Sequence, residues 1–108
     1  MQTSTLRTAL LLLLLFAGAA KVLAEPVWID VRSAAEHRVK HIEGDPRISH
    51  TEIVAQVSQL FPDKTTEIHL YCAAGVRAAK AKRALEAAGY TQVSNAGGID
   101  DAISARGL

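Results

Sequence analysis

The chain has 108 residues, with 12 Lys and Arg against 11 Asp and Glu and a formal net charge of +1 at pH 7. This balance supplies neither a cationic stripe for nucleic acid nor a charged tail for a membrane surface, so both partner classes are excluded. The single cysteine, Cys72, cannot form an internal disulfide, so packing alone must stabilise the fold.

The N-terminal segment is typical of a secretory signal peptide. One cation, Arg7, precedes an unbroken apolar run over residues 9–20, and Val22 and Ala24 occupy the two small-residue positions that a signal peptidase recognises. The run is shorter than the roughly 20 residues that a helix needs to cross a bilayer. We therefore predict cleavage after Ala24, so that residues 1–24 are removed. Residues 25–108 would then be one small soluble domain, a periplasmic monomer without stable attachment to the membrane.

Apolar runs and helical spacings alternate along the predicted domain. In chain order they predict a strand over 27–31, a helix over 34–37, a turn over 44–46, a helix over 53–61, a strand over 68–71, a helix over 78–88, a strand over 93–95, a turn at 97–98 and a helix over 99–106. We expect Ser33 and Thr51 to cap the first two helices and Gly89 to end the third. Strands alternating with helices predict an α/β fold, with a mainly parallel sheet covered by helices on both faces.

Cys72 follows the strand that ends at Tyr71 and opens a loop of mostly small residues. The loop consists of Ala73, Ala74, Gly75, Val76 and Arg77. Parallel sheets carry their chemistry beyond the carboxyl ends of the strands, and Gly75 can adopt the positive φ that a tight loop needs. Successive loop N–H groups and the start of the next helix would form an anion site, which lowers the pKa of the thiol and leaves an exposed thiolate. A buried, inert cysteine is the alternative.

Four segments resemble the rhodanese family in order and spacing. They are Trp28 to Arg32, His41 to Gly44, Tyr71 to Arg77 and Asn95 to Gly98. The resemblance covers residues 26–102 and implies a rhodanese-like fold and a two-step sulfur transfer. The active cysteine, here Cys72, would take the outer sulfur of thiosulfate, release sulfite and hold a persulfide that cyanide or a thiol acceptor removes. A ring of amides can stabilise these anions without a metal or organic cofactor.

The resemblance also bears on residues around the loop. Arg77 would attract and orient the donor, unless it is only a solvated cation. Asp30 and Arg32 match the Asp-x-Arg of the family, and we interpret both as structural support rather than as catalytic groups. Asp45 departs from the family pattern, in which a small buried residue follows Gly44. The resemblance therefore does not predict the local backbone or the rim of the substrate pocket at this position.

Two sets of polar residues have plainer interpretations, and two other functions are alternatives. Lys80, Lys82 and Arg83 are interpreted as a solvated helix face. No metal is expected, because His37, His41, His50 and His69 lack metal-ligand spacing. A phosphatase or arsenate reductase on the same fold is the enzymatic alternative, but phosphatases of this kind use Cys-x5-Arg, and position 78 is Ala78. A binding-only module, the other alternative, generally lacks the cysteine.

Overall fold

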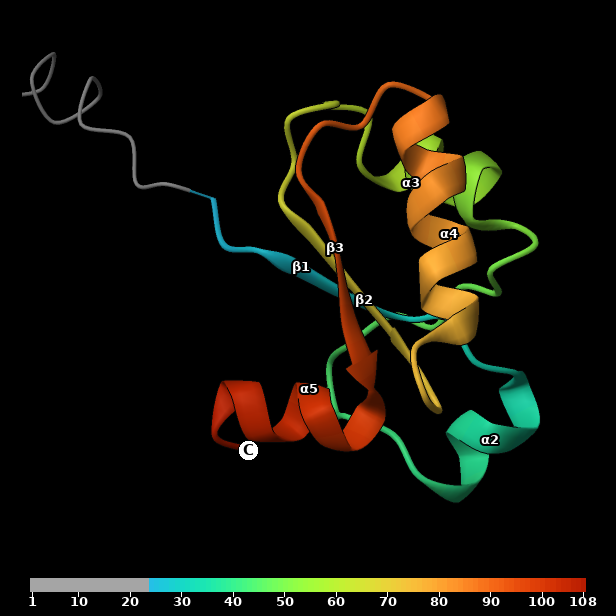
Figure 1. Cartoon of the computed structure of the whole chain (residues 1–108), viewed down its shortest axis with the longest axis vertical. Helices are drawn as coiled ribbons and strands as arrows, with labels where there is room; N and C mark the ends of the chain where they lie inside the picture. Colours follow the sequence, from blue (N-terminus) through green and yellow to red (C-terminus); the bar gives the residue numbers. More distant parts are fainter. Residues whose placement is uncertain (1–23) are drawn as a thin grey trace, which may run out of the picture.

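Three parallel strands form the centre of the structure, which is a computed structural model that describes residues 24–108. They are β1 (Val27–Asp30), β2 (Ile68–Cys72) and β3 (Val93–Gly98), in the spatial order β1-β2-β3 (Figure 1). The predicted signal peptide lies, apart from Ala24, outside the described residues. Among these residues, no helix is long and apolar enough to cross a membrane.

Strand β2 lies between the other two and is the most buried element. Its residues Ile68, Leu70 and Tyr71 are fully buried, as expected for a strand of a parallel sheet that is covered on both faces. The pairing with β3 shifts register between Leu70 and Cys72, so that Cys72 lies opposite Gly98. The irregularity therefore falls at the strand end that carries the cysteine.

Helices cover both faces of the sheet, which confirms the predicted α/β fold. On one face, α3 (Ile53–Leu60) and α4 (Val76–Ala87) contribute to a core that includes Leu70 and Cys72. On the other face, α5 (Ile99–Arg106) packs with Tyr71 in a second, smaller cluster. Successive side chains of a strand point to opposite faces, which explains why Tyr71 and Cys72 belong to different clusters.

The short helix α2 (Ala34–Val39) is held mainly by polar contacts. Ser33 caps it as predicted: its Oγ accepts a hydrogen bond from the N–H of Glu36, and the Glu36 carboxylate accepts one from the N–H of Ser33. No residue of α2 is buried. Its position therefore depends on side-chain bonds to the rest of the molecule rather than on an apolar face.

Two details of the expected elements are wrong. Thr51 does not cap α3, because its hydroxyl is bonded to Ser49 and the helix begins after Glu52. The pair Gly97 and Gly98 does not form a separate turn, because Gly98 pairs with Cys72 and both glycines extend β3.

Both ends of α4 involve glycine. The helix begins at Val76, two residues earlier than expected, because Gly75 has φ of +92° and directs the chain from the loop into the first turn. The expected glycine stop is confirmed: Gly89 has φ of +100°, and its N–H donates to the carbonyl of Glu86.

Candidate active site

The sulfur of Cys72 lies at the end of β2, inside the loop that leads to α4. The N–H of Gly75 donates a hydrogen bond to Sγ over 3.0 Å. The expected exposure of Cys72 is wrong, since the residue is only 1% exposed. The backbone that supplies the amides also encloses the sulfur, so the same loop that stabilises a thiolate shields it from bulk water.

Two opposing effects determine the pKa of Cys72. Burial raises the pKa of the thiol, but the backbone N–H groups of Ala78, Ala74, Gly75 and Arg77 together lower it by more, so the pKa lies below that of an ordinary thiol. Arg77 and Ala78 belong to the first turn of α4, where N–H groups have no acceptor within the helix. An anionic sulfur supplies that acceptor, so the loop favours the thiolate.

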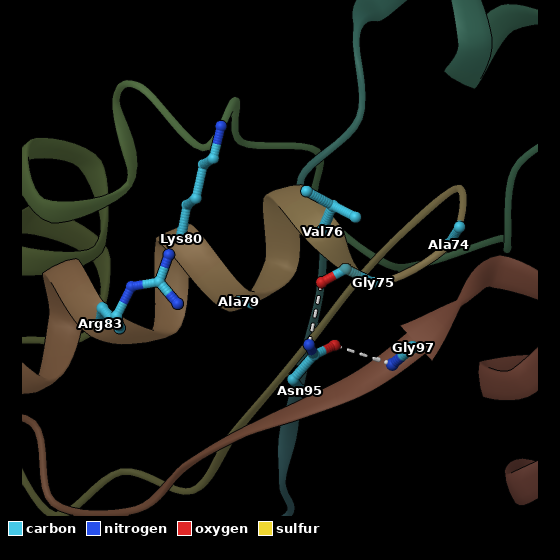
Figure 2. Close-up of a pocket in the computed structure, with 8 residues that line it drawn as sticks. All are labelled: Ala74, Gly75, Val76, Ala79, Lys80, Arg83, Asn95 and Gly97. Atoms are coloured by element: carbon cyan, nitrogen blue, oxygen red, sulfur yellow. Dashed lines mark hydrogen bonds between the residues drawn. The ribbon is translucent and has the colours of Figure 1, made fainter.

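Asn95 joins the cysteine loop to β3. Its Nδ2 donates to the carbonyl of Gly75 over 2.9 Å, and its Oδ1 accepts from the N–H of Gly97 over 2.9 Å (Figure 2). In the sequence, Asn95 was recognised only as part of a motif, and this role was not predicted. An amide side chain near the end of the neighbouring strand, just before two glycines, was the available signal.

Gly98 permits close packing between the loop and β3. A Cβ atom at this position would collide with the carbonyl oxygen of Ala73. Any residue larger than glycine would therefore push the start of the loop away from the strand and disturb the amides around Cys72.

Arg77 forms a bidentate ion pair with Glu36 of α2. Its NH1 and NH2 groups donate to the two carboxylate oxygens over 2.6 and 3.0 Å. The hydrogen bonds from Arg77, followed by one from Ser33, lower the pKa of Glu36 to about 2. The hydrogen bond to Glu36 raises the pKa of Arg77 most, burial lowers it, and the charges of Glu36 and Cys72 raise it further, so that the pKa lies above its ordinary value. This role of Glu36 at the site was not predicted from the sequence.

Asp30 and Arg32 form a buried ion pair at the end of β1. Arg32 donates from Nε to Oδ1 over 3.0 Å and from NH2 to Oδ2 over 2.8 Å, and NH2 also reaches the carbonyl of Lys40 over 2.6 Å. These bonds connect β1 to the end of α2. Because these bonds fix the backbone at the ends of β1 and α2 and do not reach the cysteine loop, we propose a supporting role for Asp30 and Arg32.

Asp45 lies on the opposite face of the sheet from Cys72. It accepts a hydrogen bond from the Tyr71 hydroxyl over 2.8 Å, and Arg106 donates to both of its oxygens over 2.6 and 3.0 Å. Burial and the neighbouring carboxylate raise the pKa of Tyr71. The guanidinium of Arg106 also lies 4.6 Å from the centre of the Trp28 ring. Asp45 thus joins the segment between α2 and α3 to β2 and α5. It lines neither the pocket beside the cysteine loop nor the pocket along α2.

Within residues 24–108, no group of three or more His, Cys, Asp or Glu side chains could hold a metal ion. The chemistry available at this site is that of one activated sulfur, a set of amide donors and one arginine.

Comparison with known proteins identifies the family. A family model described as Rhodanese-like domain matches residues 15–104. The chain belongs to this family. The resemblance found in the sequence is therefore confirmed, although the match begins before the predicted cleavage site and does not test it.

The matches to three relatives cover most of this rhodanese-like protein and most of each relative. Thiosulfate sulfurtransferase PspE from Escherichia coli strain K12 is 36% identical over 91 residues, which cover 84% of this chain and 88% of the relative. The solved structure "rhodanese with anions from E. coli" is 36% identical with a TM-score of 0.68, covering 71% of this chain and 91% of that one. A rhodanese-like domain protein from Staphylococcus aureus is 31% identical with a TM-score of 0.61, covering 74% and 78%.

Proposed function

We propose that this protein is a thiosulfate sulfurtransferase that carries the transferred sulfur as a persulfide on Cys72. The observation that carries the proposal is the convergence of backbone N–H groups on one sulfur whose pKa is lowered. The similarity to a relative named as a thiosulfate sulfurtransferase supports the same substrate.

The proposed reaction has two displacement steps at sulfur. The Cys72 thiolate attacks the outer sulfur of thiosulfate, and the sulfur–sulfur bond of the donor breaks with its electron pair leaving on sulfite. A new bond joins Sγ to the transferred sulfur. Cyanide or a thiol then attacks that outer sulfur, and the electron pair of the broken bond returns to Sγ. No oxidant or reductant is required, and the amide ring stabilises the anion in both resting states.

Arg77 has the position and the donors to guide the anionic thiosulfate. Its guanidinium has more N–H groups than the two bonds to Glu36 occupy. The negative charge of Cys72 raises the pKa of Arg77, which supports an electrostatic role for the guanidinium in donor binding. We assign Arg77 to donor binding, together with the loop residues Ala73, Ala74, Gly75 and Val76.

The proposal also places the enzyme in the periplasm, as a monomer without a cofactor. Its support is the sequence pattern that ends at Ala24. N-terminal sequencing of the secreted form should start at Glu25, and gel filtration should give the mass of one chain. Recovery of intact Met1 from a membrane fraction would contradict the export proposal without affecting the chemistry.

Intact-mass measurement tests the reaction directly. Incubation with thiosulfate alone should add one sulfur to the protein, and later addition of cyanide should remove it and release one thiocyanate. A phosphatase would instead hydrolyse aryl phosphates and gain no sulfur. A binding-only module would neither gain sulfur nor hydrolyse phosphates. An unchanged mass in protein shown to be folded by circular dichroism would overturn the proposal.

A further inference from the structure

A pocket of about 500 Å³ lies beside the cysteine loop, between α4 and β3 (Figure 2). It is lined by Ala74, Gly75, Val76, Ala79, Lys80, Arg83, Asn95 and Gly97. Three of these residues belong to the loop around Sγ. The pocket therefore extends from the rim of the candidate active site along one side of α4.

The α4 side of this pocket is a single helical stripe. Val76 precedes Ala79 and Lys80 by three and four residues, and these precede Arg83 by four and three, so the four side chains share one face of the helix. From Val76 to Arg83 the helix advances by about 10 Å. Figure 2 shows Lys80 and Arg83 following one another along the helix, away from Gly75. Lys80 and Arg83 are thus close enough to the loop for one small molecule to contact both the loop and these two cations.

The positive charge of this stripe is not neutralised by an ion pair. In the part of the chain that the structure describes, no carboxylate forms a salt bridge with Lys80 or Arg83, and none of the lining residues is acidic. Asp101 lies beside Gly97, where it accepts a hydrogen bond from the N–H of Gly98. In Figure 2, Gly97 and Arg83 lie at opposite ends of the view.

The α2 side of the site differs in its charges. A pocket of about 370 Å³ there is lined by Arg32, Ala35, Glu36, Val39 and Lys40. Each charged residue in this set has a partner: Asp30 for Arg32, Arg77 for Glu36 and Asp100 for Lys40. Of these two pockets, the one along α4 is therefore the one with cations left for a ligand.

We propose that the α4 pocket, formed by the stripe from Val76 to Arg83, binds thiol acceptors that carry carboxylate groups. This inference rests on the proposed function and specifies its acceptor. The carboxylates would lie against Lys80 and Arg83, while the thiol crosses the rim at Ala74 and Gly75 to reach the persulfide, since Cys72 itself does not line the pocket. An acceptor thiolate and a persulfide are both anionic, and nearby cations offset the repulsion between them.

The transfer step balances without any further reagent. The acceptor thiol loses its proton to water, and its sulfur attacks the outer sulfur of the Cys72 persulfide. The bond between that sulfur and Sγ breaks, and its electron pair stays on Sγ. The acceptor leaves as a persulfide. Lys80 and Arg83 are exposed, as expected for a solvated helix face, and the proposal gives these exposed cations a ligand. Lys82 is half-buried and does not line the pocket.

The test separates loading of the enzyme from its discharge. Protein is loaded with thiosulfate, freed of donor and discharged with mercaptosuccinate, a thiol with two carboxylates, or with the neutral 2-mercaptoethanol. The double variant Lys80→Ala/Arg83→Ala is compared with wild type and with Lys82→Ala, a matched loss of charge on the same helix. We expect the double variant to discharge about five- to tenfold more slowly with subsaturating mercaptosuccinate, given the usual strength of exposed ion pairs.

The controls make each outcome decisive. Loading should be equal in the three proteins, discharge by 2-mercaptoethanol should change less than about twofold, and high salt should reduce the advantage of wild type with mercaptosuccinate. Equal discharge by mercaptosuccinate in wild type and double variant would overturn the inference and leave the proposed function intact. Slower loading with unchanged discharge would also overturn it, because the cations would then serve the donor. Wild type that never loads would refute the proposed function itself.

Discussion

Tyr71 and Cys72 are neighbours on β2, yet the polar groups around them are organised in opposite ways. On the α5 face, the Tyr71 hydroxyl and the Arg106 guanidinium both donate to Asp45, so donors and charges meet partners within the cluster. On the α4 face, several backbone N–H groups converge on a single sulfur. The Asp45 cluster is closed, because its donors and charges are matched within it. Around Cys72, several N–H donors share one sulfur as their acceptor.

This difference separates a structural polar cluster from a reactive one. A carboxylate beside a guanidinium is neutral as a pair, so it exerts little field on its surroundings and its main effect is to connect two segments. Amides that point at one centre cannot neutralise one another, so they retain a field that stabilises any anion placed there. The number of unmatched donors, rather than the number of charged residues, distinguishes the two faces of β2.

Removal of the sulfur should have the largest effect on the reactive side. Cys72→Ser should abolish sulfur transfer, at least about a thousandfold, because a hydroxyl stays protonated and cannot form a persulfide. Thiocyanate formation measures the loss, and circular dichroism should show an unchanged fold. A variant with near wild-type turnover would disprove the role of Cys72.

Breaking the closed cluster should cost stability rather than activity. Asp45→Ala leaves Arg106 and the buried Tyr71 hydroxyl without their acceptor and should lower the free energy of unfolding by about 2 to 4 kcal/mol. Urea unfolding measures this change, and Tyr71→Phe, a milder control, should cost about 1 kcal/mol. Folded Asp45→Ala should keep its sulfur transfer rate. A rate that falls as steeply as the stability would show that the two faces are coupled.

Arg77 offers a more moderate test of the reactive side. Arg77→Ala should lower kcat/KM for thiosulfate by an amount equivalent to about 1 to 3 kcal/mol, the range for a charge-assisted hydrogen bond. Initial rates at subsaturating thiosulfate give this value directly. If they are unchanged, Arg77 is a solvated cation paired with Glu36 and takes no part in donor capture.

Glu36→Gln should have the smallest effect on donor binding. It should strengthen this binding, whereas Arg77→Ala weakens it. The substitution removes the charge that neutralises Arg77 while it keeps a hydrogen-bonding side chain, so KM for thiosulfate should fall about twofold with kcat nearly unchanged. Separate measurement of kcat and KM decides this. A higher KM would mean that Glu36 is needed to orient Arg77 rather than to balance its charge.

The pH dependence distinguishes the two ionised groups. The pKa of Glu36 is depressed from 4.5 to about 2, so the pair with Arg77 is complete above the ordinary carboxyl range and is lost only as the pH falls towards 2. The pKa of Cys72 is also lowered, so transfer should persist at a lower pH than an ordinary thiol allows. We expect one acid limb, from Cys72, that remains in Glu36→Gln. Its disappearance in that variant would assign the limb to Glu36.

The sequence by itself determined the features that depend on local patterns. Alternating apolar segments predicted the α/β fold, Ser33 marked the start of α2, and Gly75 marked a position that needs positive φ. The spacing of four motifs predicted the family. Local prediction was wrong at Thr51, whose hydroxyl bonds to a neighbouring side chain instead of the helix.

Only the tertiary structure decided which distant groups meet. Arg77 and Glu36 are 41 residues apart, and Arg106 and Asp45 are 61 apart. Such pairs depend on strand register, on helix placement and on side-chain rotamers, which no local periodicity specifies. The burial of Cys72 has the same origin, because the sulfur is enclosed only when the loop closes against β3.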